Sequence, residues 1–334
     1  MLKFGGSSKE MKRSEFLRTV ALGTLATAIP FDIQAKEIGE ERKKETLSFG
    51  IITDLHQDLT FDAPMRLQAF VEEMNRKQVD FIIQLGDFCV PKKENQIILD
   101  IWNSFQGDAF HVIGNHEFDE NKSLEQIMDF FSLKQNYYSF DRKGHHFVVL
   151  DGNGKIPGNE GMRYPSYFHK QQLEWLEQDL NSTSLPTIVF IHQGLDHNGV
   201  HNREAVRILL DNCNKKAGFT KVKVVFSGHH HMDYTNVING IHYVQINSAV
   251  YRWLGEPYNN TSFSQEAYTK YPYLRNMGYY KDPLWAHVQI ESDELRLTGK
   301  ESSWYGQSPV QLGEPIVSWN YVSAAKISDR LIKL

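Results

Sequence analysis

Short apolar runs alternate along the chain with segments of helical periodicity. Each run has the length of a buried strand, and the intervening segments place their apolar residues on one face of a helix. The predicted strands are residues 49–53, 81–85, 110–113, 147–150, 187–191 and 222–226. The predicted helices are residues 64–77, 94–105, 170–180 and 203–213. Such alternation is typical of an α/β fold in which helices cover sheets.

The pattern changes after residue 233, where aromatic residues and loop signals become frequent. Residues 237–242 predict a hairpin with Asn239-Gly240 at its turn. Strand signals follow near residues 285–290 and 295–298. We therefore expect one domain over residues 46–300, with residues 301–334 packing on it as a C-terminal tail.

The N-terminal residues 1–35 have the pattern of an export signal. Lys12, Arg13 and Arg18 precede an apolar stretch over residues 20–29, and Ala26-Thr27-Ala28 offers a cleavage site. The segment resembles a twin-arginine signal in which Ser14 replaces the second arginine, so both export routes stay open, as does an ordinary amphipathic helix. Residues 36–45 are predicted to be a charged linker. We expect export to the bacterial periplasm or the exterior, with no transmembrane segment in the mature chain.

Composition and charge narrow the range of partners. The chain has 41% hydrophobic and 23% charged residues, as globular proteins do. Its 36 Lys and Arg residues against 41 Asp and Glu residues give a formal net charge of −5, so we expect no nucleic-acid partner. The two cysteines, Cys89 and Cys213, have neither metal-binding spacing nor a disulfide framework.

Polar residues of metal-ligating type follow the predicted strands. They are Asp54, His56, Asp87, Asn115, His116, His192, His229 and His231. In open α/β sheets ligands bind outside the carboxyl ends of the strands, so we expect these side chains at one edge. Gly86, Gly114 and Gly228 stand beside them and permit sharp backbone turns.

These residue types in this order favour a centre with two divalent metals. Carboxylates, imidazoles and an amide oxygen are the ligands that such cations select. Two cations about 3.5–4 Å apart lower the pKa of a shared water and neutralise charge on a phosphoryl group during its transfer. A single histidine at a strand end is more often structural, but the ordered series argues for chemistry.

The series Asp54-x-His56, Gly86-Asp87, Gly114-Asn115-His116-Glu117, His192 and Gly228-His229-x-His231 resembles the signature of the calcineurin-like metallophosphoesterase superfamily. The resemblance covers residues 48–250 and implies a four-layer α/β/β/α sandwich of two mixed sheets flanked by helices. It implies that one metal is held by Asp54, His56, Asp87 and His231 and the other by Asp87, Asn115, His192 and His229. Asp87 would bridge the metals, which the resemblance limits to Mn, Fe, Zn, Co or Ni. It gives His116 the role of binding the phosphoryl oxygen or protonating the leaving group.

Departures from the superfamily patterns narrow the branch. Phosphoprotein phosphatases continue the second block as Gly-Asp-x-x-Asp-Arg-Gly, which supplies a carboxylate partner for the catalytic histidine and an arginine for phosphate. Residues 86–92 here read Gly-Asp-Phe-Cys-Val-Pro-Lys and lack both. Purple acid phosphatases carry a tyrosine where Val90 stands, and they lack the histidine found here as His56.

The remaining resemblance is to enzymes that act on small phosphorylated molecules. We expect a hydrolase of a small phosphodiester, a nucleotide pyrophosphate or a phosphomonoester. In the loop over residues 152–167, Arg163 is a candidate for substrate binding and Tyr164 for a base or phosphate contact. Tyr251, Arg252 and Trp253 could wall the site or only pack the core. The alternatives are a nuclease of the same superfamily and a non-catalytic metal-containing binding protein.

Overall fold

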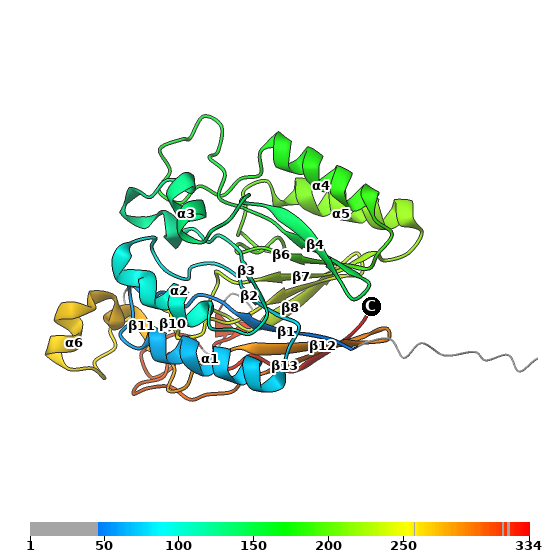
Figure 1. Cartoon of the computed structure of the whole chain (residues 1–334). Helices are drawn as coiled ribbons and strands as arrows, with labels where there is room; N and C mark the ends of the chain where they lie inside the picture. The colour runs from blue at the N-terminus through cyan, green and yellow to red at the C-terminus, as the bar shows by residue number, and fades with distance from the viewer. Residues whose placement is uncertain (1–45, 257, 316, 319–320) are drawn as a thin grey trace, which may run out of the picture. The chain divides into compact units, whose positions relative to one another are not determined.

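Two six-stranded sheets organise the chain from residue 46 onwards (Figure 1). The computed structural model describes residues 46–256, 258–315, 317–318 and 321–334. The expected signal segment and charged linker lie outside these residues. Among the described residues, no helix has both the length and the apolar character needed to cross a membrane.

The first sheet has the strand order β16-β13-β12-β1-β2-β3. Its strands are β1 Leu47–Ile52, β2 Phe81–Gln84, β3 Asp108–His111, β12 Ala286–Glu291, β13 Glu294–Gly299 and β16 Arg330–Lys333. The neighbours β1, β2 and β3 run parallel, whereas β12, β13 and β16 add antiparallel pairs on the other side of β1. The sheet is therefore mixed, and the carboxyl ends of its parallel strands meet at one edge.

The second sheet has the order β4-β5-β6-β7-β9-β8. Its strands are β4 Tyr138–Arg142, β5 His145–Val149, β6 Thr187–Phe190, β7 Val222–Ser227, β8 Tyr234–Ile238 and β9 Ile241–Gln245. The four inner strands are parallel, and the two edge strands are antiparallel to their neighbours. The predicted hairpin is β8–β9, whose turn residues Asn239 and Gly240 both have positive φ, as a type I′ turn requires.

Helices cover the outer faces of both sheets. In Figure 1, α1 and α2 lie along the first sheet and α4 and α5 along the second. The helices are α1 Ala63–Lys77, α2 Gln96–Trp102, α3 Leu124–Phe130, α4 Lys170–Ser182, α5 Arg203–Ala217 and α6 Gln265–Lys270. Short elements complete the described part: η1 Lys93–Asn95, η2 His116–Asn121, η3 Pro272–Asn276, β10 Tyr251–Trp253, β11 Met277–Tyr279, β14 Val317–Ser318 and β15 Tyr321–Val322.

Three layers of buried apolar side chains separate the four layers of secondary structure. Alternation along the strands sorts them: in β5, Phe147 and Val149 face the first sheet while Val148 faces α4 and α5. Between the sheets, Phe49 stacks on Phe81 with ring centroids 4.7 Å apart. The predicted four-layer sandwich of two mixed sheets is confirmed.

The C-terminal segment contributes to the first sheet. We expected residues 301–334 to pack on the domain as a tail; within this segment, β16 pairs with β13 as an edge strand that the sequence pattern did not predict. Ile327 and Ile332 are buried in the core between the sheets. Arg330 also pairs with Asp233 next to the β7–β8 connection, which ties this segment to the second sheet.

Candidate two-metal phosphoesterase site

The polar residues that follow the parallel strands converge where the carboxyl ends of the two sheets meet. Among the described residues, three groups of ligand-type side chains each hold their ligand atoms within 4.8 Å of one another. The groups are Asp54, His56 and His231; Asp87, His192 and His229; and His56, Asp87 and His116. Four strands, β1, β2, β6 and β7, thus deliver six of the seven predicted ligands to one place. The seventh, Asn115, follows β3 and lines the same cavity.

The backbone at these ligands adopts a conformation that side chains with a Cβ rarely take. Asp54, His56, Asp87, His229 and His231 have φ values of 52°, 47°, 50°, 77° and 51°. Such residues persist only when the surroundings over-determine them. Asp54 N–H donates to Gly86 O at 3.1 Å and His56 N–H donates to Asp87 O at 2.9 Å, so the loops after β1 and β2 hold each other. Strain concentrated at the ligands is typical of a functional site.

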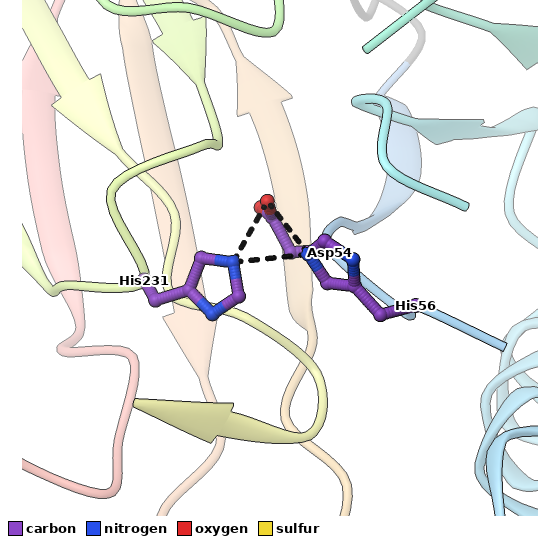
Figure 2. A group of neighbouring side chains, drawn as sticks. All are labelled: Asp54, His56 and His231. Carbon is purple, nitrogen blue, oxygen red and sulfur yellow. Dashed lines mark hydrogen bonds and ion pairs between the residues drawn. The ribbon is translucent and has the colours of Figure 1, made fainter. Parts of the chain in front are cut away.

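Figure 2 shows the first group, in which Asp54, His56 and His231 point toward one another. Nε2 of His231 lies 3.2 Å from Oδ1 of Asp54 and 3.1 Å from Nε2 of His56. Nδ1 of His231 donates to the carbonyl of Tyr251 at 2.9 Å, so in the neutral ring Nε2 carries the lone pair that faces the group. Burial lowers the pKa of His56 to about 4, which favours its neutral, metal-ligating form.

The second group repeats this arrangement with different strands. Nε2 of His192 lies 3.1 Å from Oδ2 of Asp87 and 3.3 Å from Nδ1 of His229. Nδ1 of His192 donates to the carbonyl of Leu85 at 2.7 Å, which again directs Nε2 toward the group. Burial opposes protonation of His192, but the Asp87 charge outweighs it and raises the pKa of His192 to about 9. A positive charge is therefore favoured between these side chains.

The donor set fits two divalent cations. Facing lone pairs and a carboxylate within about 3.3 Å repel one another unless a proton or a cation lies between them. Oδ1 of Asn115 is buried and has no hydrogen-bond partner, as an oxygen that serves as a metal ligand would. Oδ2 of Asp87 lies 3.6 Å from Nε2 of His56 and 3.1 Å from Nε2 of His192, so one carboxylate reaches both groups. The individual ligand roles stay predictions.

His116 stands next to both groups and has a carboxylate partner that the sequence analysis missed. Its Nδ1 lies 2.7 Å from Oδ2 of Asp119, and the Tyr164 hydroxyl donates to Oδ1 of the same carboxylate at 2.7 Å. Burial opposes protonation of His116, but the charge of Asp87 and the hydrogen bond to Asp119 raise its pKa to about 9. Residues 86–92 lack the carboxylate that pairs with the catalytic histidine in phosphoprotein phosphatases. Here Asp119, three residues after His116, provides a carboxylate partner for this histidine.

Glu117 is a second residue whose role was not predicted. Its carboxylate accepts hydrogen bonds from the backbone N–H groups of Asp87, Phe88 and Gly114 at 3.1, 2.6 and 2.8 Å. Burial and the nearby Asp87 charge raise its pKa to about 7. Glu117 therefore joins the loops after β2 and β3. Its place in the Gly-Asn-His-Glu block was the sequence feature that could have indicated this role, but the block was considered only for Asn115 and His116.

A cavity of about 660 Å³ opens above the two groups. Its lining includes His56, Asp87, Asn115, His116, Asp119, Arg163, Tyr164, His229, His231, Tyr251, Trp253, Tyr258 and Tyr273. Arg163 is at the rim: its side chain is 76% exposed, its guanidinium lies 4.9 Å from the Tyr164 ring centre, and Nη2 lies 3.7 Å from Oδ1 of Asp119. The predicted substrate contact is thus near the cavity mouth and away from the ligand groups.

A four-layer sandwich with paired Asp and His groups at the carboxyl ends of its strands defines a metal-dependent phosphoesterase. Residues 47–233 match the model of the calcineurin-like phosphoesterase family, to which the chain belongs. The predicted superfamily and the metal-dependent enzyme class are confirmed.

Individual relatives are distant. The chain is 22% identical over 269 residues to a 3′,5′-cyclic-nucleotide phosphodiesterase of Nostoc sp., an alignment that covers 73% of this chain and 91% of that protein. Its fold is similar to that of a dimetal phosphatase from Danio rerio, with a TM-score of 0.54 and 16% identity over 78% of this chain and 99% of the other. The similarity to the Danio rerio structure supports the fold and says nothing about the substrate.

Proposed function

We propose that this chain is an exported phosphodiesterase that uses two divalent metals to hydrolyse small phosphodiesters, with 3′,5′-cyclic nucleotides as the leading candidates. The observation that carries the proposal is the sharing of Asp87 by two groups of ligand atoms beneath a cavity that also holds His116. The distant Nostoc phosphodiesterase supports the substrate class. Nucleotide pyrophosphates and phosphomonoesters are the alternative substrates.

The ligand groups would hold one metal at Asp54, His56, Asp87 and His231 and the other at Asp87, Asn115, His192 and His229. Such a pair lowers the pKa of a water and neutralises the charge of the transferring phosphoryl group. The protein fixes the ligand atoms in advance, because the rings of His192 and His231 are oriented by backbone carbonyls on their far nitrogens. Reorganisation on binding is therefore small.

His116 is placed to move a proton during ester cleavage. The pKa of Asp119 is lowered, since burial is outweighed by the hydrogen bond and charge of His116, so the carboxylate holds the proton on Nδ1. Nε2 is then left to hydrogen-bond a phosphoryl oxygen or to protonate the leaving alkoxide. Tyr164 fixes Asp119 from the opposite side, and Arg163 adds positive charge at the cavity rim for an arriving anion.

Metal titration with two reporter substrates tests the proposal. The mature chain, stripped of metal, is reconstituted with Mn, Zn, Co or Ni and assayed on bis-p-nitrophenyl phosphate and p-nitrophenyl phosphate. We expect metal-dependent turnover that favours the diester. A preference for the monoester would replace the diesterase with a phosphomonoesterase, and a lack of turnover of both reporters and of cyclic nucleotides with two metals bound would contradict the hydrolase.

Export rests on the N-terminal sequence alone and is tested separately. The full chain carries Lys12, Arg13 and Arg18 before an apolar stretch and Ala26-Thr27-Ala28. Expressed in a bacterium, it should be recovered outside the cytoplasm with a new N-terminus after residue 28. Mass spectrometry of each cell fraction reads both points, and an intact N-terminus confined to the cytoplasm would refute export.

A further inference from the structure

Two exposed aromatic side chains form one side of the cavity above the ligand groups. Trp253 is 40% exposed and Tyr273 is 48% exposed, and their ring centroids are 6.1 Å apart with an interplanar angle of 58°. Both line the cavity that contains His56, Asp87 and His116. We call Trp253 and Tyr273 the aromatic wall. Large aromatic rings left partly in water beside a polar site are candidates for ligand contact.

The strand β10 fixes the aromatic wall with respect to the ligand groups. At its start, Tyr251 is 2% exposed, its carbonyl accepts from Nδ1 of His231, and its ring centroid lies 4.6 Å from that of His231. Trp253 follows on the same face of the strand, with its ring centroid 6.4 Å from that of Tyr251. The ring of Tyr251 therefore separates the ligand groups from the aromatic wall. This spacing suits a ligand in which a sugar joins a phosphate to an aromatic base.

Packing in the core does not explain Trp253. Tyr251 is the buried aromatic of this strand, and Arg252 points to the other face, where Nη2 pairs with Oε1 of Glu314 at 2.9 Å. Arg252 also donates to the carbonyl of His230 at 3.2 Å, so its contacts stabilise the strand and the neighbouring loop. Trp253 remains exposed although the strand on which it lies is held on both faces.

The charges beside the aromatic wall favour a neutral ring over a cation. Among the described residues, the carboxylates that line the cavity are Asp87, Asp119 and Glu314. Asp87 lies at the ligand groups and Asp119 binds His116, whereas Glu314 is 5% exposed and paired with Arg252. A quaternary ammonium would gain from aromatic faces but would find this carboxylate already neutralised. A nucleobase gains stacking from each face and needs no counter-charge.

We propose that Trp253 and Tyr273 bind the base of a nucleotide whose phosphate lies at the ligand groups. This inference rests on the proposed phosphoesterase function and assigns the aromatic wall as its determinant of substrate specificity. Trp253 supplies the main stacking face, and Tyr273 borders it at an angle. Phosphoesters without an aromatic ring then bind only through the phosphate end of the cavity.

Binding of three phosphate ligands to the metal-reconstituted protein tests the proposal without turnover. Calorimetry compares adenosine 5′-monophosphate, ribose 5-phosphate and phosphocholine on the wild type and on Trp253→Ala, Trp253→Phe, Tyr273→Ala and Tyr305→Ala. Tyr305 is the matched control, since it is 44% exposed and packs on Phe263 without lining the cavity. We expect the wild type to favour the nucleotide over ribose 5-phosphate by about tenfold or more.

The variants give the decisive contrast. Trp253→Ala should bring the two affinities close together, Trp253→Phe should keep most of the preference, Tyr273→Ala should reduce it and Tyr305→Ala should leave it unchanged. Equal affinities in the wild type, an unchanged ratio in Trp253→Ala, or tighter binding of phosphocholine would each overturn the base-binding assignment. A protein that shows the Trp253-dependent preference but hydrolyses no phosphodiester would contradict the proposed function and leave the base-binding site standing.

Discussion

His116 and His146 are each held by aspartate carboxylates, but they lie at opposite ends of the parallel strands. His116 follows β3 at the carboxyl end and binds Asp119. His146 lies at the start of β5, with Nδ1 at 2.6 Å from Asp141 and Nε2 at 2.8 Å from Asp179. In both, burial disfavours protonation and the carboxylate partners raise the pKa.

The two histidines differ in how many of their ring nitrogens are paired with a carboxylate. Asp141 and Asp179 occupy both nitrogens of His146, so its protonated form is satisfied within the protein and joins β4, β5 and α4. His116 has a carboxylate partner at Nδ1 and lines the cavity beside the ligand groups. The raised pKa that both histidines share therefore does not separate a functional histidine from a structural one, and the position of His116 beside the cavity does. We expect substitutions at the carboxyl end to change activity and those at the amino end to change stability.

The largest expected effect is that of Asp87→Asn. The substitution removes the carboxylate of Asp87, which lies near His56 and His192 and which we propose to hold both metals. Turnover should fall by at least about 10³-fold, with a loss of bound metal. Asp141→Asn is the matched control at the amino end, because it removes a carboxylate from His146 and should leave turnover unchanged.

Metal content, circular dichroism and kcat on bis-p-nitrophenyl phosphate measure this pair of variants. Asp87→Asn should keep the native secondary structure. If it retains wild-type kcat with two metals bound, the shared-carboxylate arrangement is wrong. A large loss of activity in Asp141→Asn would remove the functional distinction between the two ends.

His116→Ala should lower kcat by about 10²-fold because it removes the proposed proton donor. Asp119→Asn should have a smaller effect of the same kind, since it leaves the imidazole but weakens its orientation. The test uses two diesters that differ in leaving group. If His116 protonates the leaving oxygen, its loss should cost more for an alkoxide than for p-nitrophenolate, and equal losses would assign His116 to phosphate binding instead.

Metal removal should lower thermal stability through the same groups. Imidazole nitrogens and the Asp87 carboxylate lie 3.1–3.3 Å from their neighbours in the two groups, and a cation bound between them would add ligand bonds that exist only in the folded chain. At a metal concentration about 100 times Kd the stabilisation is about 2.7 kcal/mol, or about 5 °C in Tm for a domain of this size. Calorimetry with and without chelator measures it. Asp87→Asn should lose most of the shift, and an unchanged Tm in the chelated wild type would contradict metal binding at these groups.

The sequence was sufficient to predict most of the sheet strands and the ligand types because both depend on local pattern, whereas the arrangement in two sheets came from the resemblance to the superfamily. Apolar runs of strand length ended at Asp54, Asp87 and His192, and parallel strands bring such ends together. The Asp119 contact was not predictable in this way. It depends on a break in η2, where Asp119 has ψ of 160° and Glu120 has φ of 56°, and no periodicity marks that break.

Exposure was equally hidden in the sequence. Tyr251 and Trp253 are consecutive members of one face of β10, yet the first is 2% exposed and the second 40% exposed. The difference arises where the strand passes from the core to the cavity, which only the tertiary arrangement fixes. The edge strand β16 was missed for a related reason, since its pairing with β13 joins residues far apart in the chain.

The smallest expected effect is on the pH dependence of stability at the amino end. Because the folded pKa of His146 lies above its unfolded value, the contribution of its ion pairs is fully present below the unfolded pKa of about 6.5 and is lost as the pH rises through the folded pKa. His146→Asn should therefore be less stable than the wild type by on the order of 1 kcal/mol at pH 6, and the gap should narrow at higher pH. Urea unfolding across this range measures the gap, with kcat on the diester as the companion readout. A gap that stays constant with pH would show that folding does not raise the pKa of His146, whereas a change in kcat would extend the functional site to the far end of the strands.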